Sequence, residues 1–243
     1  MGVLRFTAAN LDRIRFQTLA AALGNTSDGA WTCAVLLKQA SIGAFHAQAY
    51  LCNSTPTTKA GWSINGSNQM VADVAAYGGV GTTALDDTAE TYIAVATKQA
   101  GTAAVSYHVY KRSTTTWASV TAGSNLADQT ASSMLELGTF EGGGDLANGW
   151  IGLVGFWEGQ MSQANAETLD NNWRTSDWWS NAHGQPTALI ECNVAAASLV
   201  DLAGNATNIA VTGTPAVDAG ETLSSWNFDS TGALPPVVAW YVG

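Results

Sequence analysis

The chain has 243 residues, and its 9 basic residues against 19 acidic ones give a formal net charge of −10. Such a charge repels phosphate backbones and anionic lipid surfaces, which excludes nucleic acid and membranes as expected partners. Only 12% of the residues are charged and 47% are hydrophobic, and much of the remainder is Thr, Ser, Asn and Gly. This composition is typical of solvated strands around a sizeable core rather than of helical or disordered chains.

The start of the chain has no features of a secretory signal. Residues 1–6 lead into Asp12, Arg13 and Arg15 instead of an apolar stretch. No apolar run reaches the ~18 residues that a membrane span requires. We therefore expect synthesis in a cytoplasm.

The cysteine content argues against both a disulfide scaffold and a zinc knuckle. Cys33, Cys52 and Cys192 make an odd count of 3 and show no CxxC spacing. Cys33 and Cys192 lie in apolar, strand-like runs and are expected to be small buried hydrophobic residues.

Short strands separated by turn residues are expected through the first 140 residues. Residues 17–23 are predicted to form one or two helical turns, Asn65-Gly66 predicts a type I′ hairpin turn, and residues 113–116 predict a hairpin loop. The run 31–38 is apolar on both faces and is expected at the centre of a sheet. The predicted strands span residues 3–6, 11–16, 31–38, 45–51, 60–64, 69–77, 91–98, 105–111 and 134–137.

The most informative segment spans residues 148–169. An apolar strand from Trp150 to Trp157 is followed by a Gly-containing turn and by Ser162, which predicts a helix cap. The helix predicted over residues 162–173 places Ala166, Leu169 and Trp173 on one side. The segment resembles the penultimate strand and following helix of LamG-like, concanavalin A-like jelly rolls, where "G-x-I-x-x-V-x-x-W … L-S-x-x-E-I" recurs.

The resemblance to LamG-like domains extends over roughly residues 3–217. Residues 4–16 resemble the opening "L-x-F-x-G-x-D-x-V-x-F", residues 31–37 the strand "F-T-I-S-A-W-V", and residues 105–111 the strand "V-x-L-Y-V-N-G". The resemblance implies an all-β fold, an antiparallel jelly-roll β-sandwich of the concanavalin A-like kind with one short helix.

The end of the chain departs from the usual order of the family. Residues 199–206 with 211–214 resemble the "D-x-S-G-N-G-x … G-T" segment that ordinarily opens a LamG-like domain. A circular permutation explains this order, with the late segment pairing beside the first strand. We predict a jelly-roll domain over residues 1–223 and an apolar, Pro-broken tail over residues 224–243, which docks either on the domain or on a neighbouring protein. The partner-binding side chains of the tail are expected to be Trp226, Phe228, Trp240 and Tyr241.

No catalytic constellation is found. Glycan-cleaving jelly rolls carry an E-x-D-x-E or E-x-D-x-x-E pattern that flanks the scissile bond, whereas Glu136 and Glu141 lack an intervening Asp. None of the three histidines has a Cys or carboxylate at metal-ligand spacing. His108 alternates with Tyr107 and Val109 and is interpreted as an ordinary sheet histidine. We expect no enzymatic activity.

Ligand-binding candidates come from loop acids and aromatic residues. No cofactor is expected, but the family resemblance raises calcium, for which Asp86, Asp87 and Asp145 are the loop carboxylates. Packing is favoured over ligand binding for the tryptophans as a group, because a sandwich needs large side chains between its sheets. Trp31, Trp150 and Trp157 are expected in the core. The better candidates for exposure and for sugar stacking are Trp62, Trp117, Trp178 and Trp179, with Trp173 beside them.

The leading functional hypothesis is a non-enzymatic structural protein of a tailed-phage virion. The weakly charged, Ala-, Thr- and Gly-rich chain resembles LamG-like domains of capsid decoration, minor capsid and tail proteins. In that role it is made in the host cytoplasm, is displayed on the virion surface, forms a homo-oligomer and binds a major capsid or tail protein. The alternative is a carbohydrate-binding module that recognises host surface glycans.

Overall fold

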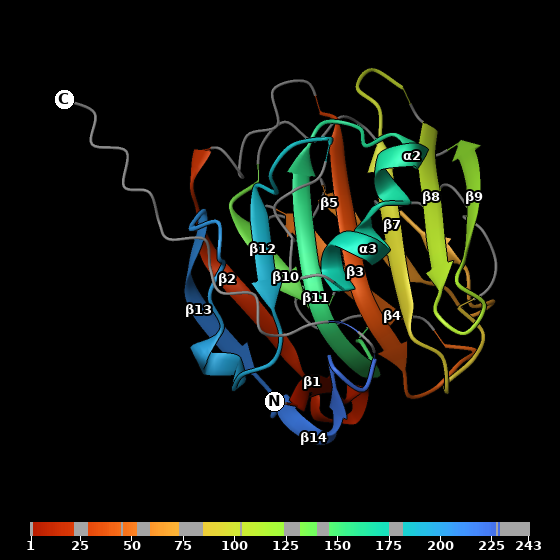
Figure 1. Cartoon of the computed structure of the whole chain (residues 1–243). Helices are drawn as coiled ribbons and strands as arrows, with labels where there is room; N and C mark the ends of the chain where they lie inside the picture. The colour runs from red at the N-terminus through yellow and green to blue at the C-terminus, as the bar shows by residue number, and fades with distance from the viewer. Residues whose placement is uncertain are drawn as a thin grey trace.

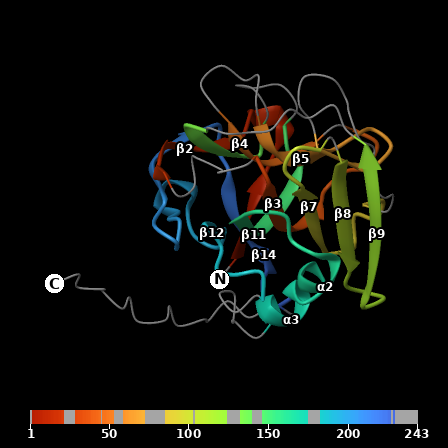
Figure 2. The ribbon, with the colours of Figure 1, turned by 90° about the horizontal axis from the view of Figure 1, so that it is seen from above.

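The computed structural model describes residues 2–21, 29–44, 46–52, 59–72, 85–102, 104–123, 132–139, 146–174, 182–226 and 228. Two antiparallel sheets pack face to face, and short helices cover the outer face of one of them (Figures 1 and 2). The predicted jelly-roll sandwich is therefore confirmed. No helix among the described residues has the length and apolar character needed to cross a bilayer.

The first sheet, sheet A, has the strand order β14-β1-β11-β3-β7-β8-β9, and β12 pairs with β11 beyond the end of β1. β3 lies between β11 and β7 and is buried on both faces, as predicted. The strands of sheet A are β1 (Gly2–Phe6), β3 (Trp31–Gln39), β7 (Tyr92–Lys98), β8 (Ala104–Lys111), β9 (Thr116–Gly123), β11 (Gly149–Glu158), β12 (Ala188–Glu191) and β14 (Ala216–Thr222).

The second sheet, sheet B, has the order β13-β2-β10-β4-β5-β6. Its inward side chains and those of sheet A form one apolar core that includes Phe16, Trp31 and Trp62. The strands of sheet B are β2 (Arg13–Leu19), β4 (His46–Cys52), β5 (Lys59–Ile64), β6 (Met70–Val71), β10 (Met134–Leu137) and β13 (Ala206–Thr212).

A second apolar cluster forms on the outer face of sheet A. The predicted helix is present there as two consecutive short helices, α2 (Gln163–Ala166) and α3 (Leu169–Arg174), and the Ser162 side chain caps α2 as expected. Ala166, Leu169 and Trp173 are fully buried against the sheet. Two 3-10 turns complete the described elements, η1 (Ala8–Asn10) and η2 (Ala196–Ser198).

The helical turns predicted for residues 17–23 are wrong over residues 17–19. These residues continue β2, because β13 from the far end of the chain supplies their pairing partner through Leu19↔Ala206 and Thr18↔Thr207. A distant strand overrides the local preference here. Residues 22–28 lie outside the described part.

The hairpin predicted at Asn65-Gly66 is present between β5 and β6, but its turn is not type I′. The left-handed residue is Asn68, with φ of 61°, and its amide donates to the Asn65 carbonyl at 2.9 Å. The Asn65 side-chain oxygen accepts from the amides of Ser67 at 2.9 Å and Gln69 at 3.0 Å. This side-chain bonding favours a longer loop than the two-residue turn. Of the predicted strand 69–77, Met70–Val71 forms β6, and residues 73–77 are not described.

The late segment pairs with the start of the chain, but not with its first strand. β13, which lies within this segment, is beside β2 in sheet B, and β14, which follows the segment, is beside β1 in sheet A. The expected pairing of the late segment beside the first strand is therefore wrong by one strand. The division at residue 223 stays a prediction.

All three cysteines are buried. Burial raises the pKa of the Cys33 and Cys192 thiols, so both remain protonated. The predicted role of Cys33 and Cys192 as small buried hydrophobic residues is confirmed.

Candidate binding site

The outer face of the β8–β9 hairpin carries an ordered row of polar and aromatic side chains. Residues 112–115 form the predicted hairpin loop and fix the register of the two strands. Because side chains alternate between the faces of a sheet, every second pair points outward, away from inward-facing Tyr107 and Val109. The outward pairs with polar or aromatic side chains are Ser106↔Thr121, His108↔Ser119 and Tyr110↔Trp117.

A hollow of about 320 Å³ lies over the first two of these pairs. Its remaining wall comes from the segment that leads into α2. Every polar side chain that lines it is neutral: hydroxyls, amides and one imidazole. The lining residues are Ser106, His108, Ser119, Val120, Thr121, Gln160, Met161, Ser162 and Gln163.

Two buried threonines hold the wall in place. The Met161 amide hydrogen-bonds to Thr32 Oγ1 and to Thr97 Oγ1, each at 2.9 Å. Thr32 also donates to the Gly159 carbonyl at 2.9 Å. Thr32 and Thr97 belong to the inner strands β3 and β7, so the segment before α2 is fixed to the buried centre of sheet A.

His108 is the one ionisable residue in the lining. Its side chain is only 3% exposed, and Nδ1 hydrogen-bonds with Ser119 Oγ at 2.8 Å. Nε2 is buried and has no hydrogen-bond partner among the residues that the structure describes. Burial lowers the pKa of His108, an effect that the nearby Glu167 carboxylate partly opposes. The imidazole is therefore neutral at pH 7.

This lowered pKa predicts a pH-dependent stability. Protonation of His108 is easier in the unfolded chain, whose histidine titrates near pH 6.5, than in the folded one. The contribution of His108 is thus fully present above pH 6.5, falls as the pH drops below that value, and levels off below the folded pKa. Urea unfolding at several pH values should show this loss in the wild type and a flatter profile in His108→Gln. Identical profiles for the two proteins would contradict a neutral, buried imidazole.

Trp117 borders the hollow on the same face of β9. It is half-buried, two residues along the strand from Ser119, and its ring packs on Tyr110 with centroids 5.3 Å apart. Arg174 of α3 lies 5.3 Å from the centre of the Tyr110 ring and donates to the Tyr110 hydroxyl and, at 3.1 Å, to Asp170. One predicted aromatic candidate therefore lies firmly held beside the hollow.

The other predicted sugar-stacking residues are either buried or outside the described residues. Trp62 is 0% exposed and packs in the core between the sheets, which corrects its expected exposure. The reason is the alternation of β5, which turns Trp62 inward with Ala60 and Ile64. Trp173 is fully buried under α3, while Trp178 and Trp179 lie outside the described residues.

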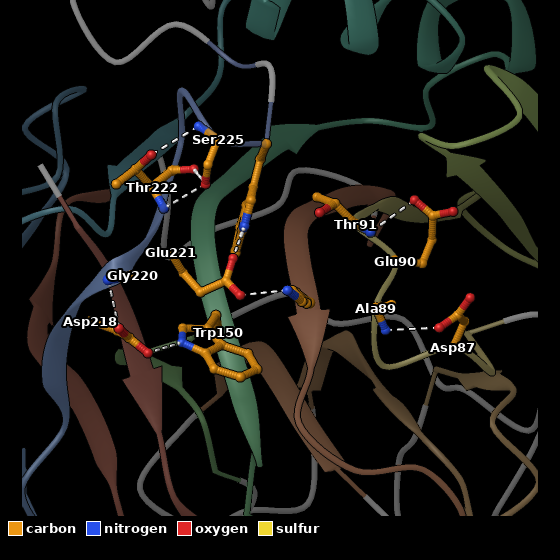
Figure 3. Close-up of polar contacts among 12 residues, drawn as sticks. Asp87, Ala89, Glu90, Thr91, Trp150, Asp218, Gly220, Glu221, Thr222 and Ser225 are labelled. Carbon is orange, nitrogen blue, oxygen red and sulfur yellow. Dashed lines mark hydrogen bonds and ion pairs between the residues drawn. The ribbon is translucent and has the colours of Figure 1, made fainter.

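The predicted calcium candidates do not form a site among the described residues. Asp87 accepts a hydrogen bond from the Ala89 amide at 2.8 Å, as expected of a turn residue (Figure 3). Asp86 lies 4.0 Å from Lys111, and Asp145 is not described. Within the described ranges no cluster of three potential ligands occurs.

The described part of the predicted tail packs on its own domain. Trp226 and Phe228 are each 2% exposed and belong to the apolar cluster on sheet A, which corrects their assignment as partner-binding residues. Trp226 Nε1 donates to Glu221 Oε2 at 2.6 Å, and Lys38 donates to Oε1 of the same carboxylate at 2.5 Å (Figure 3). Trp240 and Tyr241 lie outside the described residues.

Trp150 is not a core residue, in contrast to Trp31 and Trp157, which are buried as predicted. It is half-buried on the outer face of sheet A, where Arg5 and Lys38 of the neighbouring strands lie 5.0 and 5.5 Å from its ring centre. Its Nε1 donates to Asp218 at 2.9 Å (Figure 3). Two cations already contact this ring, so Trp150 is no second sugar platform.

Sequence reasoning missed most of the hollow. It weighed His108 only as a sheet residue and did not single out Ser106, Ser119 or Thr121. The available signal was the hairpin loop at residues 112–115, which sets these positions opposite one another. The contribution of residues 160–163 had no such local signal.

No known protein family matches the sequence, and no curated protein matches it significantly. Among solved structures, a protein of Bacteroides ovatus that is provisionally described as carbohydrate-binding has a TM-score of 0.50 at 12% identity, over 90% of this chain and 62% of that one. The LG1-3 region of the laminin alpha2 chain has a TM-score of 0.45 at 15% identity, over 63% and 31%. The enzymatically active domain of tailspike protein 2 of bacteriophage CBA120 has a TM-score of 0.48 at 11% identity, over 70% and 27%. The chain spans less than two thirds of each, and at these identities the likeness concerns the fold alone.

Proposed function

We propose that this domain binds carbohydrate without cleaving it, at the hollow over β8 and β9. The observation that carries the proposal is the combination of neutral hydroxyl, amide and imidazole groups in the lining with the partly buried Trp117 beside them on the same face of β9. Sugars present hydroxyl groups at their edges and apolar C–H faces, so a site for them needs hydrogen-bonding groups beside an aromatic surface. A volume of about 320 Å³ suits one sugar unit at the end of a glycan.

The chemistry of the lining supports a non-enzymatic role. Glycoside hydrolysis ordinarily uses two carboxyl groups on either side of the scissile bond. No Asp or Glu is among the described residues that line the hollow. His108 has Ser119 as its partner and no carboxylate hydrogen-bonded to it, so it lacks the orienting group of a catalytic triad.

A wider proposal places the domain on the surface of a tailed-phage particle, as a capsid decoration, minor capsid or tail protein. The weakly charged, Ala-, Thr- and Gly-rich chain supports this role, and glycan binding is compatible with it, since a displayed module of this kind brings a particle to host glycans. Mass spectrometry of purified particles, together with crosslinking to the major capsid or tail protein, tests it. Absence of the chain from the particles would contradict this wider role and leave the binding proposal untouched.

Trp117→Ala is expected to weaken glycan binding by about tenfold or more. Stacking of a nucleic-acid base on an aromatic ring contributes ~1–3 kcal/mol, we expect a sugar face to stack comparably, and 1.4 kcal/mol is a factor of ten. A glycan array identifies a ligand of the wild-type chain, and calorimetry with that ligand compares the variants. Trp117→Phe keeps an apolar ring and should retain most of the affinity. Running the array with calcium and with EDTA separates any role of loop carboxylates. No binding above background for the wild type under either condition would refute the proposed function.

A further inference from the structure

We infer that the hollow selects uncharged sugars, and that Nε2 of His108 is the group that recognises a hydroxyl of the bound unit. This inference rests on the proposed function and names the ligand class and the specificity-determining residue of the same site. It is carried by two independent observations. One is the charge of the lining, and the other is a polar atom that the fold buries without a partner.

The first observation is the absence of cationic groups from the lining. None of the described residues around the hollow is Lys or Arg. Arg174, which approaches the same face at Tyr110, is engaged with the Tyr110 hydroxyl and Asp170. The charge that acts on His108 is the Glu167 carboxylate, which is negative. A carboxylated sugar would lose water without gaining a counter-charge, and desolvating an unpaired charge is costly.

The second observation is the state of the His108 ring. Nδ1 is engaged with the Ser119 hydroxyl, which fixes the orientation of the ring, whereas Nε2 is buried and has no partner among the described residues. Leaving a buried polar atom unpaired costs free energy, and a ligand hydroxyl that reaches it after a small shift of a lining side chain removes that cost. A site built in this way discriminates strongly against a ligand that lacks the matching hydroxyl. The neutral imidazole accepts or donates at Nε2 according to its tautomer, and a sugar hydroxyl satisfies either need.

The other two histidines differ from His108 in their hydrogen bonds and in their position relative to the hollow. His46 Nδ1 hydrogen-bonds with the Leu146 carbonyl at 3.2 Å, and His183 Nε2 hydrogen-bonds with the Glu158 carbonyl at 3.0 Å. Neither residue lines the hollow. They therefore serve as internal references in any measurement on the histidine rings.

Two substitutions separate the two nitrogens of His108. The amide of Asn lies close to the position of Nδ1, so His108→Asn keeps a partner for Ser119 but has no group at the position of Nε2. The longer Gln places its amide near the position of Nε2. We expect His108→Asn to weaken binding of a neutral sugar at least tenfold and His108→Gln to stay within about threefold of the wild type. Thermal unfolding of both variants verifies that they fold.

The probes are methyl glycosides of glucose, galactose, mannose and N-acetylglucosamine, with glucuronate and N-acetylneuraminate as acidic counterparts. ¹⁵N NMR of the histidine rings follows each titration. A neutral sugar should shift the His108 Nε2 resonance and leave those of His46 and His183 in place, and the acidic sugars should bind at least tenfold more weakly. Acidic sugars that bind as well as neutral ones, an unmoved His108 signal on saturation, or equal affinities of the Asn and Gln variants would each overturn the inference while leaving carbohydrate binding established. A wild-type chain that binds none of these sugars and nothing on the glycan array would refute both this inference and the proposed function.

Discussion

Replacing Trp62 by alanine is expected to lower the free energy of unfolding by ~3–5 kcal/mol, the cost of removing a large buried aromatic side chain. Trp62 lies on β5 with 0% exposure and packs in the core between the two sheets. Its indole also contacts the Cys33 thiol of the central strand β3, so the substitution opens a cavity that both sheets share. Urea unfolding followed by circular dichroism gives the difference directly.

The matched control for this variant is Trp117→Ala. Trp117 is half-buried on the outer face, so its removal leaves a smaller cavity and should cost less stability. We therefore expect Trp62→Ala to lose mainly stability and Trp117→Ala to lose mainly sugar affinity. A Trp62→Ala protein that keeps wild-type stability but no longer binds sugar would show that Trp62 is a ligand platform after all.

Trp226→Ala is expected to lower the free energy of unfolding by ~3 kcal/mol or more, because its ring covers the outer face of sheet A. The packing around it is close: a Cβ on Gly152 of β11 would lie 2.8 Å from Leu223 and 3.0 Å from the Trp226 ring. Glu221 accepts from Trp226 and from Lys38 of β3, which ties the segment to the central strands. Differential scanning calorimetry measures the loss.

Two companion variants show which part of Trp226 matters. Trp226→Phe retains most of the ring and loses the hydrogen bond to Glu221, so it should cost about 1–2 kcal/mol. Ser224→Ala, at an exposed position in the same segment, should leave stability within ~0.5 kcal/mol of the wild type. A Trp226→Ala protein that melts at the wild-type temperature but no longer binds its partner in the assembled particle would contradict this structural role and would indicate a partner-binding role for Trp226.

Local sequence patterns were sufficient to predict a strand wherever its residues alternate clearly between polar and apolar or are apolar on both faces. The predicted strands 31–38 and 105–111 correspond to β3 and β8, and Ser162 caps α2 as expected. The pattern failed for residues 17–19, since their partner β13 begins at residue 206. No local propensity reports on a pairing across such a distance.

The candidate site was harder to predict because both faces of sheet A are largely apolar. Trp62 shares its face of β5 with Ala60 and Ile64 and is buried between the sheets, whereas Trp117 shares its face of β9 with Ser119 and Thr121. On the outer face of sheet A a third layer, made by α2, α3 and the segment around Trp226, packs over the central strands. The hollow lies on the outer face between β8, β9 and the segment that leads into α2, and its walls come from three separate segments of the chain.

The pairing of β14 with β1 has a mechanical consequence. Gly2 lies opposite Thr222 and Arg5 opposite Ala216, so the antiparallel pair has its two outer ends side by side. A force applied between residues 2 and 222 loads these hydrogen bonds one after another, as in opening a zipper, instead of shearing them together. A domain held at these two positions would therefore begin to open at this pair under low load, whereas anchorage at one of them leaves the pair unloaded and the hollow on sheet A intact.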